Sequence, residues 1–256
     1  MRRRLDALRA GTGIVLATVL VACGAGPTVA TGVDGIDVLF IGNSLTFEND
    51  MPGILKALLD SAGLESRIES FAPGGWGLQD HWEAGRSREL IADGGWDVVI
   101  LQQGPSATEG RPSLLEYTPR FAGKARTVGA EIGLYMVWPA EARRFDFQGV
   151  SDSYRMAAES VGGLLFPVGE AWRAVWRRDP DFDLYGADRF HPSPAASYLA
   201  ALVFFEQLTG RSPVGLPNRL DFEFVFTEDI VLTPEEALVL QQAASEANRE
   251  FARTAD

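Results

Sequence analysis

Cysteine and histidine are scarce in this chain. Its 256 residues include one cysteine, Cys23, and two histidines, His81 and His191. A lone cysteine cannot form a disulfide within the chain. The acidic residues around Glu170 and Asp179 lack the regular spacing of an oxygen-ligand loop, and they have no histidine beside them. We therefore expect no metal and no other cofactor.

Basic charge is also in short supply. Lysine and arginine number 23 against 35 acidic residues, which gives a formal net charge of −12. Nucleic-acid binding needs a basic surface to neutralise phosphates, so a nucleic-acid partner is not expected. The glycines of residues 73–77 lack the lysine and the spacing of a phosphate-binding loop. Hydrophobic residues make up 46% of the chain, enough for a large core.

The first 35 residues differ from the rest. Arg2, Arg3 and Arg4 precede a short apolar run, residues 14–22, which has the length of a signal-peptide core rather than of a membrane span. Its end, Leu20-Val21-Ala22-Cys23, resembles the lipobox of bacterial lipoproteins. That resemblance implies cleavage before Cys23 and a lipid anchor on its sulfur. A signal peptide without lipidation, with an incidental cysteine, is the alternative.

These features divide the chain into three parts. We expect a lipoprotein signal peptide over residues 1–22, a flexible tether over 23–35 and one folded domain over 36–256. The protein would be exported to the bacterial cell envelope, and it would contact the membrane only through its N-terminal lipid.

From residue 36 onward, strand-like and helix-like patterns alternate. Short β-rich runs occur at 36–41, 67–71, 96–101, 132–138 and 164–166, and helical spacing occurs at 52–62, 114–128, 151–161, 195–209 and 234–252. Ser151 is a candidate N-cap of the third helix. Alternation of this kind predicts parallel strands joined by right-handed crossovers, and hence a three-layer α/β/α domain.

Polar residues with catalytic potential follow several of these strands. Ser44 follows the first strand, Gly75 the second and Gln103 the third, whereas Asp188 and His191 lie in a loop after the last. Open α/β sheets bind ligands at the carboxyl ends of their strands, so these loops should converge. If a serine is the nucleophile, its general base has to be one of the two histidines.

Four segments resemble the conserved blocks of the GDSL/SGNH hydrolase superfamily. They are Gly42-Asn43-Ser44-Leu45, with asparagine in place of the family's aspartate, residues 73–78, residues 102–106 and Asp188-x-x-His191-Pro192. The resemblance implies a flavodoxin-like five-stranded parallel sheet. It also implies a metal-free triad, with Ser44 as nucleophile, His191 as base and Asp188 as its orienting acid.

The same resemblance implies an oxyanion hole. Its donors would be the N–H groups of Ser44 and Gly75 and the side-chain amide of Gln103. The family's asparagine is missing from residues 102–106, so Gln102 or Ser106 could replace Gln103, and Gly74 or Gly77 could replace Gly75. His81 is the alternative base, or a residue that lines the pocket or packs in the core.

The expected activity is hydrolysis of short-chain acyl esters, most simply acetyl esters, on a small molecule or a carbohydrate. One alternative keeps the enzyme class but changes the substrate: a lipase, a lysophospholipase or a thioesterase. Another is a catalytically silent, glycan-binding lipoprotein on the same scaffold.

Overall fold

The computed structural model describes residues 35–222 and 229–251. The signal peptide, Cys23 and all but the last residue of the tether lie outside these ranges. Within them, no helix is both long enough and apolar enough to span a bilayer.

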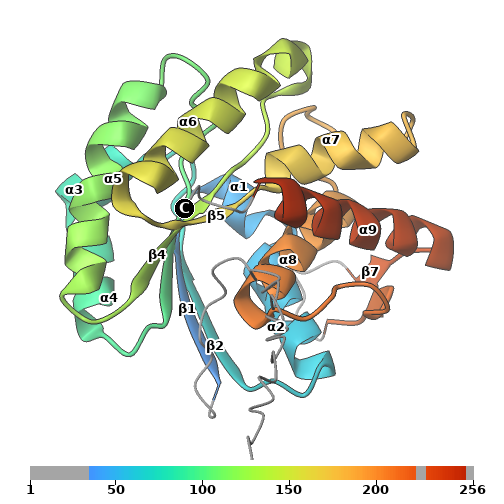
Figure 1. Cartoon of the computed structure of the whole chain (residues 1–256), viewed down its shortest axis with the longest axis horizontal. Helices are drawn as coiled ribbons and strands as arrows, with labels where there is room; N and C mark the ends of the chain where they lie inside the picture. Colours follow the sequence, from blue (N-terminus) through green and yellow to red (C-terminus); the bar gives the residue numbers. More distant parts are fainter. Residues whose placement is uncertain (1–34, 223–228, 252–256) are drawn as a thin grey trace, which may run out of the picture.

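The centre of the fold is a sheet of five parallel strands (Figure 1). Its order is β2-β1-β3-β4-β5, which confirms the predicted three-layer α/β/α, flavodoxin-like architecture. The strands are β1 (Ile36–Ile41), β2 (Ser66–Phe71), β3 (Val98–Leu101), β4 (Glu131–Tyr135) and β5 (Leu164–Phe166).

Burial explains why these segments are strands. The central strands β1 and β3 are almost continuously apolar and buried, as expected where helices cover both faces of a parallel sheet. Val38 pairs with Val98, and Ile41 pairs with Leu101. β1 and β3 therefore end side by side, and the loops that follow them start from adjacent points on the same edge.

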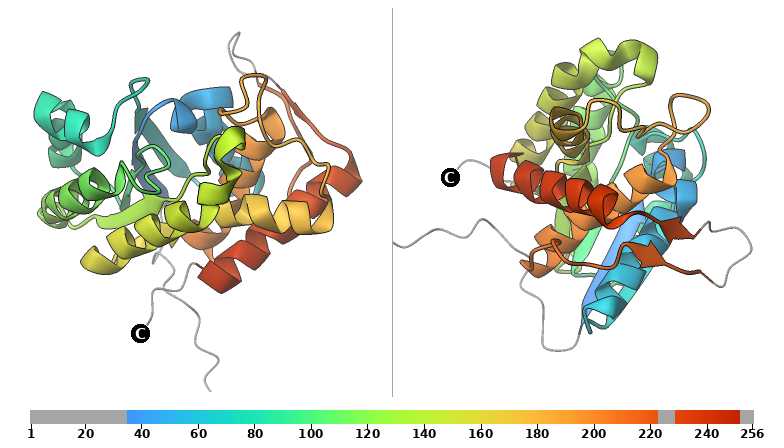
Figure 2. Two further views of the ribbon diagram at one scale, coloured as in Figure 1. Left: turned by 90° about the horizontal axis from the view of Figure 1, so that it is seen from above. Right: turned by 90° about the vertical axis from the view of Figure 1, so that its right-hand side faces the viewer.

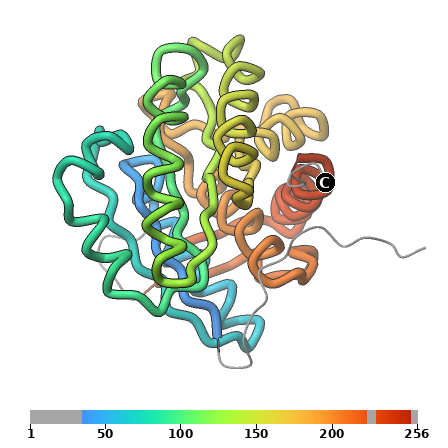
Figure 3. Tube along the Cα trace, turned by 60° about the vertical axis from the view of Figure 1, so that its left-hand side comes forward, coloured from blue at the N-terminus to red at the C-terminus, as the bar shows by residue number. Residues whose placement is uncertain are grey.

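Helices cover the two faces of the sheet. α5 (Arg111–Arg126) and α6 (Phe147–Val161) run side by side on one face (Figure 3), and α2 (Met51–Ser61) and α8 (Pro194–Thr209) cover the other. α7 (Val168–Arg178) and α9 (Pro234–Phe251) pack against α8 (Figure 2). The short helices α3 (Leu78–Ala84) and α4 (Arg86–Asp93) follow β2, and β6 (Arg219–Leu220) pairs with β7 (Ile230–Val231).

The observed helices differ from the predicted ones in two places. Ser151 is not an N-cap: α6 begins four residues earlier, at Phe147, and Ser151 is buried inside it. α7 was not expected at all, although its buried Val168, Ala171, Trp172 and Val175 have helical spacing. Its position matters because the loop that carries Asp188 and His191 runs from α7 to α8, and not directly from a strand.

Candidate active site

Ser44 stands at a sharp turn between β1 and a short helix, α1 (Ser44–Phe47). Asn43 is the N-cap of this helix, and its side-chain oxygen accepts the N–H of Leu45 at 3.1 Å. This cap sets Ser44 as the first helical residue at the carboxyl end of a central strand. The buried strand below therefore determines where the hydroxyl lies.

Gln102, directly after β3, holds this turn from below. Its Oε1 accepts the main-chain N–H of Asn43 at 2.7 Å and the hydroxyl of Thr46 at 2.8 Å. Its Nε2 donates to Asn43 Oδ1 at 3.0 Å and to the carbonyl of Gln103 at 2.8 Å. All four bonds of this fully buried amide are therefore made inside the protein, and Gln102 acts as a support of the turn.

Asn43 also connects the turn to the glycine loop after β2. Its Nδ2 donates to the carbonyl of Trp76 at 2.8 Å, while its Oδ1 accepts from Gln102. Both kinds of group are needed, because an aspartate would place a carboxylate oxygen against that carbonyl. The departure from the family's aspartate thus has a structural reason.

The structure brings together Ser44, His191 and Asp188. His191 Nε2 lies 2.8 Å from Ser44 Oγ, and His191 Nδ1 lies 2.5 Å from Asp188 Oδ2. The other carboxylate oxygen of Asp188 accepts the main-chain N–H groups of Phe190 at 3.0 Å and His191 at 2.9 Å. The serine and the histidine come from segments 147 residues apart in the sequence.

Asp188 is held as a carboxylate. The hydrogen bond from the His191 ring is the largest cause that lowers the pKa of Asp188, followed by the N–H of Phe190, and the pKa falls to about 2. A permanently ionised partner on Nδ1 fixes the imidazole tautomer whose Nε2 is free to take the serine proton.

The two ring nitrogens of His81 have partners other than Ser44. Its Nε2 lies 2.7 Å from the carbonyl of Gly42, which can only accept, so Nε2 carries the proton. Its Nδ1 then accepts the hydroxyl of Ser87 at 2.8 Å. Burial lowers the pKa of His81 below its usual value, so the ring is neutral. Of the two histidines, His191 therefore has the geometry of a base for Ser44, and His81 packs beneath the turn.

The glycine loop after β2 presents unused main-chain donors. Gly75 has a φ of +77°, a conformation that favours glycine, and it precedes the Trp76 carbonyl that Asn43 binds. Within the described part of the chain, the N–H groups of Ser44 and Gly75 have no hydrogen-bond acceptor. Two donors are therefore available on loops that Asn43 joins.

Gln103 is placed differently from what the sequence led us to expect. Its Nε2 donates to Ser106 Oγ at 3.0 Å and to the carbonyl of Gly110 at 2.9 Å, while its Oε1 accepts the N–H of Leu78 at 3.1 Å. Both amide hydrogens are thus engaged away from Ser44. The alternatives Gln102 and Ser106 are also engaged elsewhere, because the Ser106 hydroxyl donates to the carbonyl of Gly104 at 2.8 Å.

Tyr154 is a further supporting residue, although no sequence motif marks it. Its hydroxyl accepts the N–H of Gln103 at 3.1 Å and donates to the carbonyl of the same residue. Burial raises the pKa of Tyr154, so the hydroxyl keeps its proton. Its partner lies on the β3 loop, and no local pattern in the sequence indicates that pairing.

A small cavity of about 280 Å³ opens next to the residue that precedes His191. Phe190, which adjoins His191, forms part of its wall, together with residues from the loops after β3 and β4. Its lining combines apolar surface with charged groups: Pro105, Ser106, Ala107, Glu109, Pro139, Ala140, Arg143, Asp146 and Phe190. The cavity therefore adjoins the loop that carries Asp188 and His191.

No protein-family model matches the sequence, and no curated protein matches it either. Solved structures do match. A DUF4886 family protein from Bacteroides uniformis shares 21% identity at a TM-score of 0.70, over 87% of this chain and 98% of the other. An acetyl xylan esterase shares 18% identity at a TM-score of 0.52, over 65% of this chain and 96% of the other. At these identities the likeness concerns the fold.

A third structure is nearer in sequence. It is a candidate SGNH hydrolase from Slackia heliotrinireducens, 31% identical, with a TM-score of 0.58. The match covers 68% of this chain and 99% of the other. The identity, the full coverage of that relative and the shared fold lead to one conclusion: the chain belongs to the SGNH hydrolases.

Proposed function

We propose that this protein is a serine esterase in which Ser44 is the nucleophile. The single observation that carries the proposal is the continuous chain of contacts from Ser44 Oγ through the His191 ring to Asp188, at 2.8 and 2.5 Å. Hydroxyl, imidazole and carboxylate in this order form the proton path of nucleophilic acyl transfer.

The chemistry then proceeds in two halves. Ser44 Oγ attacks the ester carbonyl while His191 Nε2 takes the hydroxyl proton. The tetrahedral intermediate collapses, the C–O bond to the alcohol breaks, and His191 returns the proton to the departing oxygen. Water then attacks the acyl-serine with His191 as base again, which releases the acid and restores Ser44.

Negative charge on the former carbonyl oxygen needs fixed donors. In our proposal the N–H groups of Ser44 and Gly75 supply them, because both lack an acceptor within the described residues. A donor of this kind contributes about 3 kcal/mol to transition-state stabilisation. For Gln103 to join them, its amide would have to leave Ser106 and Gly110.

We propose short-chain acyl esters, such as acetyl groups on carbohydrates, as the substrate class. Two observations support this choice. The cavity beside Phe190 holds about 280 Å³, at the small end of ligand pockets, and one of the structures similar in fold is an acetyl xylan esterase. The proposed site of action is the cell envelope, through a lipid on Cys23.

The direct test is turnover of p-nitrophenyl acetate by the wild type and by Ser44→Ala. We expect the variant to lose activity while its circular dichroism and melting temperature stay unchanged. Full turnover by folded Ser44→Ala would remove Ser44 from the mechanism. A series of p-nitrophenyl esters of increasing chain length then tests the substrate, since a preference for long chains would favour a lipase.

A further inference from the structure

The turn that carries the triad acid and base has an unusual backbone. Arg189 lies between Asp188 and His191 and has a φ of +60°. Residues other than glycine rarely adopt this left-handed backbone conformation. The turn closes on itself, because Arg189 N–H donates to the Gly186 carbonyl at 3.0 Å and Gly186 N–H donates to the His191 carbonyl at 2.7 Å. Glycine would adopt this φ freely, so the arginine side chain needs another explanation.

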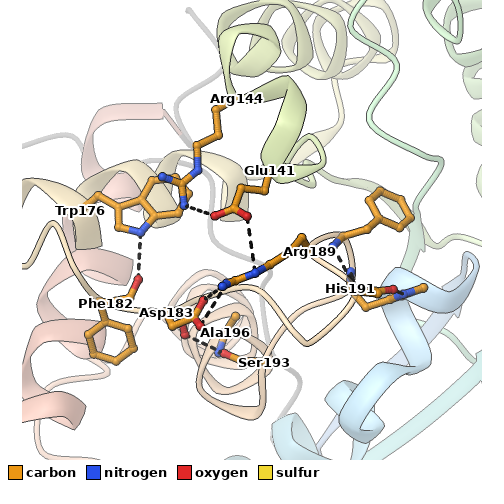
Figure 4. Close-up of polar contacts among 11 residues, drawn as sticks. Glu141, Arg144, Trp176, Phe182, Asp183, Arg189, His191, Ser193 and Ala196 are labelled. Atoms are coloured by element: carbon orange, nitrogen blue, oxygen red, sulfur yellow. Dashed lines mark hydrogen bonds and ion pairs between the residues drawn. The ribbon is translucent and has the colours of Figure 1, made fainter.

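That side chain connects two other parts of the protein. Its Nη1 binds Asp183 at 3.0 Å, at the start of the same loop, and its Nε lies 3.5 Å from Glu141, in the loop after β4 (Figure 4). Main-chain contact adds to this, because Glu141 N–H donates to the carbonyl of Arg189 at 2.9 Å. Arg189 therefore joins the catalytic loop to the β4 loop through both its backbone and its side chain.

Glu141 also pairs with a second arginine, Arg144, which contacts α7. Arg144 lies 3.4 Å from the Glu141 carboxylate, and its guanidinium stacks over the Trp176 ring of α7 at 4.1 Å (Figure 4). A cation–π contact thus joins α7 to Arg144, and two ion pairs continue from Arg144 through Glu141 to Arg189. They end at a residue adjacent to the triad acid.

The exposure of Asp188 explains why its loop needs contacts to the β4 loop. The Asp188 side chain is 52% exposed, so burial does not hold it in place. Ser44, in contrast, stands on a turn supported by the buried amide of Gln102. The serine side of the triad is held by the core, and the acid–base side depends on contacts made by its loop.

We propose that Arg189 is a positioning residue that keeps His191 aligned with Ser44. It does so by fastening the Asp188–His191 turn to Glu141 and Asp183, without contact with substrate. This inference rests on the proposed esterase function for its kinetic readout, but its structural readout is independent of that function.

The kinetic test compares Arg189→Gly, Arg189→Ala and Arg189→Lys on p-nitrophenyl acetate. Glycine adopts the left-handed φ without strain and removes the side-chain contacts, but it also loosens the backbone; Arg189→Ala removes the same contacts without that freedom and should lower kcat as well. We expect kcat to fall about tenfold in Arg189→Gly with KM little changed, because small misalignment of reacting groups costs rate rather than binding. Arg189→Lys should recover part of kcat by keeping a charge toward Asp183. Arg155→Ala, which removes an arginine that pairs with Asp152 and Glu159 on α6, is the matched control for Arg189→Ala and should keep wild-type kcat.

The structural test needs no substrate. Because the chain has two histidines, histidine-selective ¹⁵N labelling gives one ring for the triad and one, His81, as an internal reference. We expect the His191 Nδ1–H to exchange with solvent faster in Arg189→Gly than in the wild type, with the His81 Nε2–H unchanged. Wild-type kcat together with wild-type exchange in Arg189→Gly would overturn the proposal. An inactive wild type would refute the esterase function, and the exchange comparison would still decide the role of Arg189.

Discussion

At the scale of single residues, Asn43 shows most clearly how the site depends on hydrogen-bond type. It donates to the Trp76 carbonyl, and it accepts from Leu45 and from Gln102. An aspartate has the same shape but no donor. The hydrogen bond to the Trp76 carbonyl therefore favours asparagine over the family's usual aspartate at position 43.

The variant Asn43→Asp tests this reading. We expect it to lose about 1–3 kcal/mol in the free energy of unfolding, because the Trp76 carbonyl loses its donor and meets a carboxylate instead. Turnover should fall as well, since the serine and the glycine loop come apart. Urea unfolding and p-nitrophenyl acetate kinetics measure the two effects.

Asn218→Asp is a matched control. Asn218 also donates to a main-chain carbonyl, that of Leu232, but it does so beside the β6–β7 hairpin. Its replacement should lower stability and leave turnover unchanged. If Asn43→Asp were as stable and as active as the wild type, the proposed link between the two loops would be wrong.

At the scale of elements, Gln103 ties the β3 loop to the first residues of α3 and α5. Its amide satisfies the N–H of Leu78, 25 residues away in the sequence, and the carbonyl of Gly110, seven residues away. This contact could not be predicted, because the sequence shows an amide after a strand but not which loops meet it.

Substitutions of Gln103 distinguish two roles: a structural link between loops, or a donor to the oxyanion. Gln103→Leu should lower the free energy of unfolding by about 1–3 kcal/mol, since the buried N–H of Leu78 and the half-buried carbonyl of Gly110 lose their partner. Gln103→Glu keeps the acceptor for Leu78 but places a carboxylate oxygen against the Gly110 carbonyl, so its loss near neutral pH should be at least as large. Unchanged stability with a large fall in kcat would instead favour the oxyanion role inferred from the family resemblance.

His81 connects α3 to the turn after β1, and it makes stability depend on pH. Burial lowers the pKa of His81 in the folded protein, whereas the unfolded chain has an ordinary value of about 6.5. Below that pH the unfolded state binds a proton that the folded state does not. The contribution of His81 to stability is therefore complete above about pH 6.5 and is lost as the pH falls, by at most about 1.4 kcal/mol per pH unit.

Urea unfolding between pH 5 and pH 8 measures this slope. In His81→Gln, a residue that does not titrate, the pH dependence should be flatter than in the wild type over the same range. The difference between the two proteins isolates His81 from all other titrating groups. A wild-type slope in His81→Gln would show that the ring is not the buried neutral group described here.

At the scale of the whole molecule, the sequence was sufficient for the sheet. The run from Ile36 to Ile41 is apolar and ends at glycine, and β1 has the same bounds. The bounds of a buried strand can be predicted from hydrophobicity, because a short apolar run that ends at glycine is typical of such a strand. The prediction failed for α6, where Ser151 as a candidate N-cap suggested a start four residues after the observed one at Phe147.

The site was predictable only in part, for a related reason. The segments around Ser44 and around Asp188 and His191 indicate a hydrolase through their resemblance to the SGNH blocks, and parallel topology brings strand ends together. The supporting contacts, such as Tyr154 to Gln103 or Arg189 to Glu141, join side chains across loops. No local pattern encodes such pairs, because they depend on how separate elements pack.

The most direct test of the central claim is labelling with a fluorophosphonate probe, followed by peptide mass mapping. The probe reacts with a serine only when a neighbouring base activates it. We predict one label, on Ser44, in the wild type, and labelling slower by at least about a hundredfold in His191→Ala. A folded wild-type protein that remains unlabelled, or that carries the label on another serine, would contradict the account.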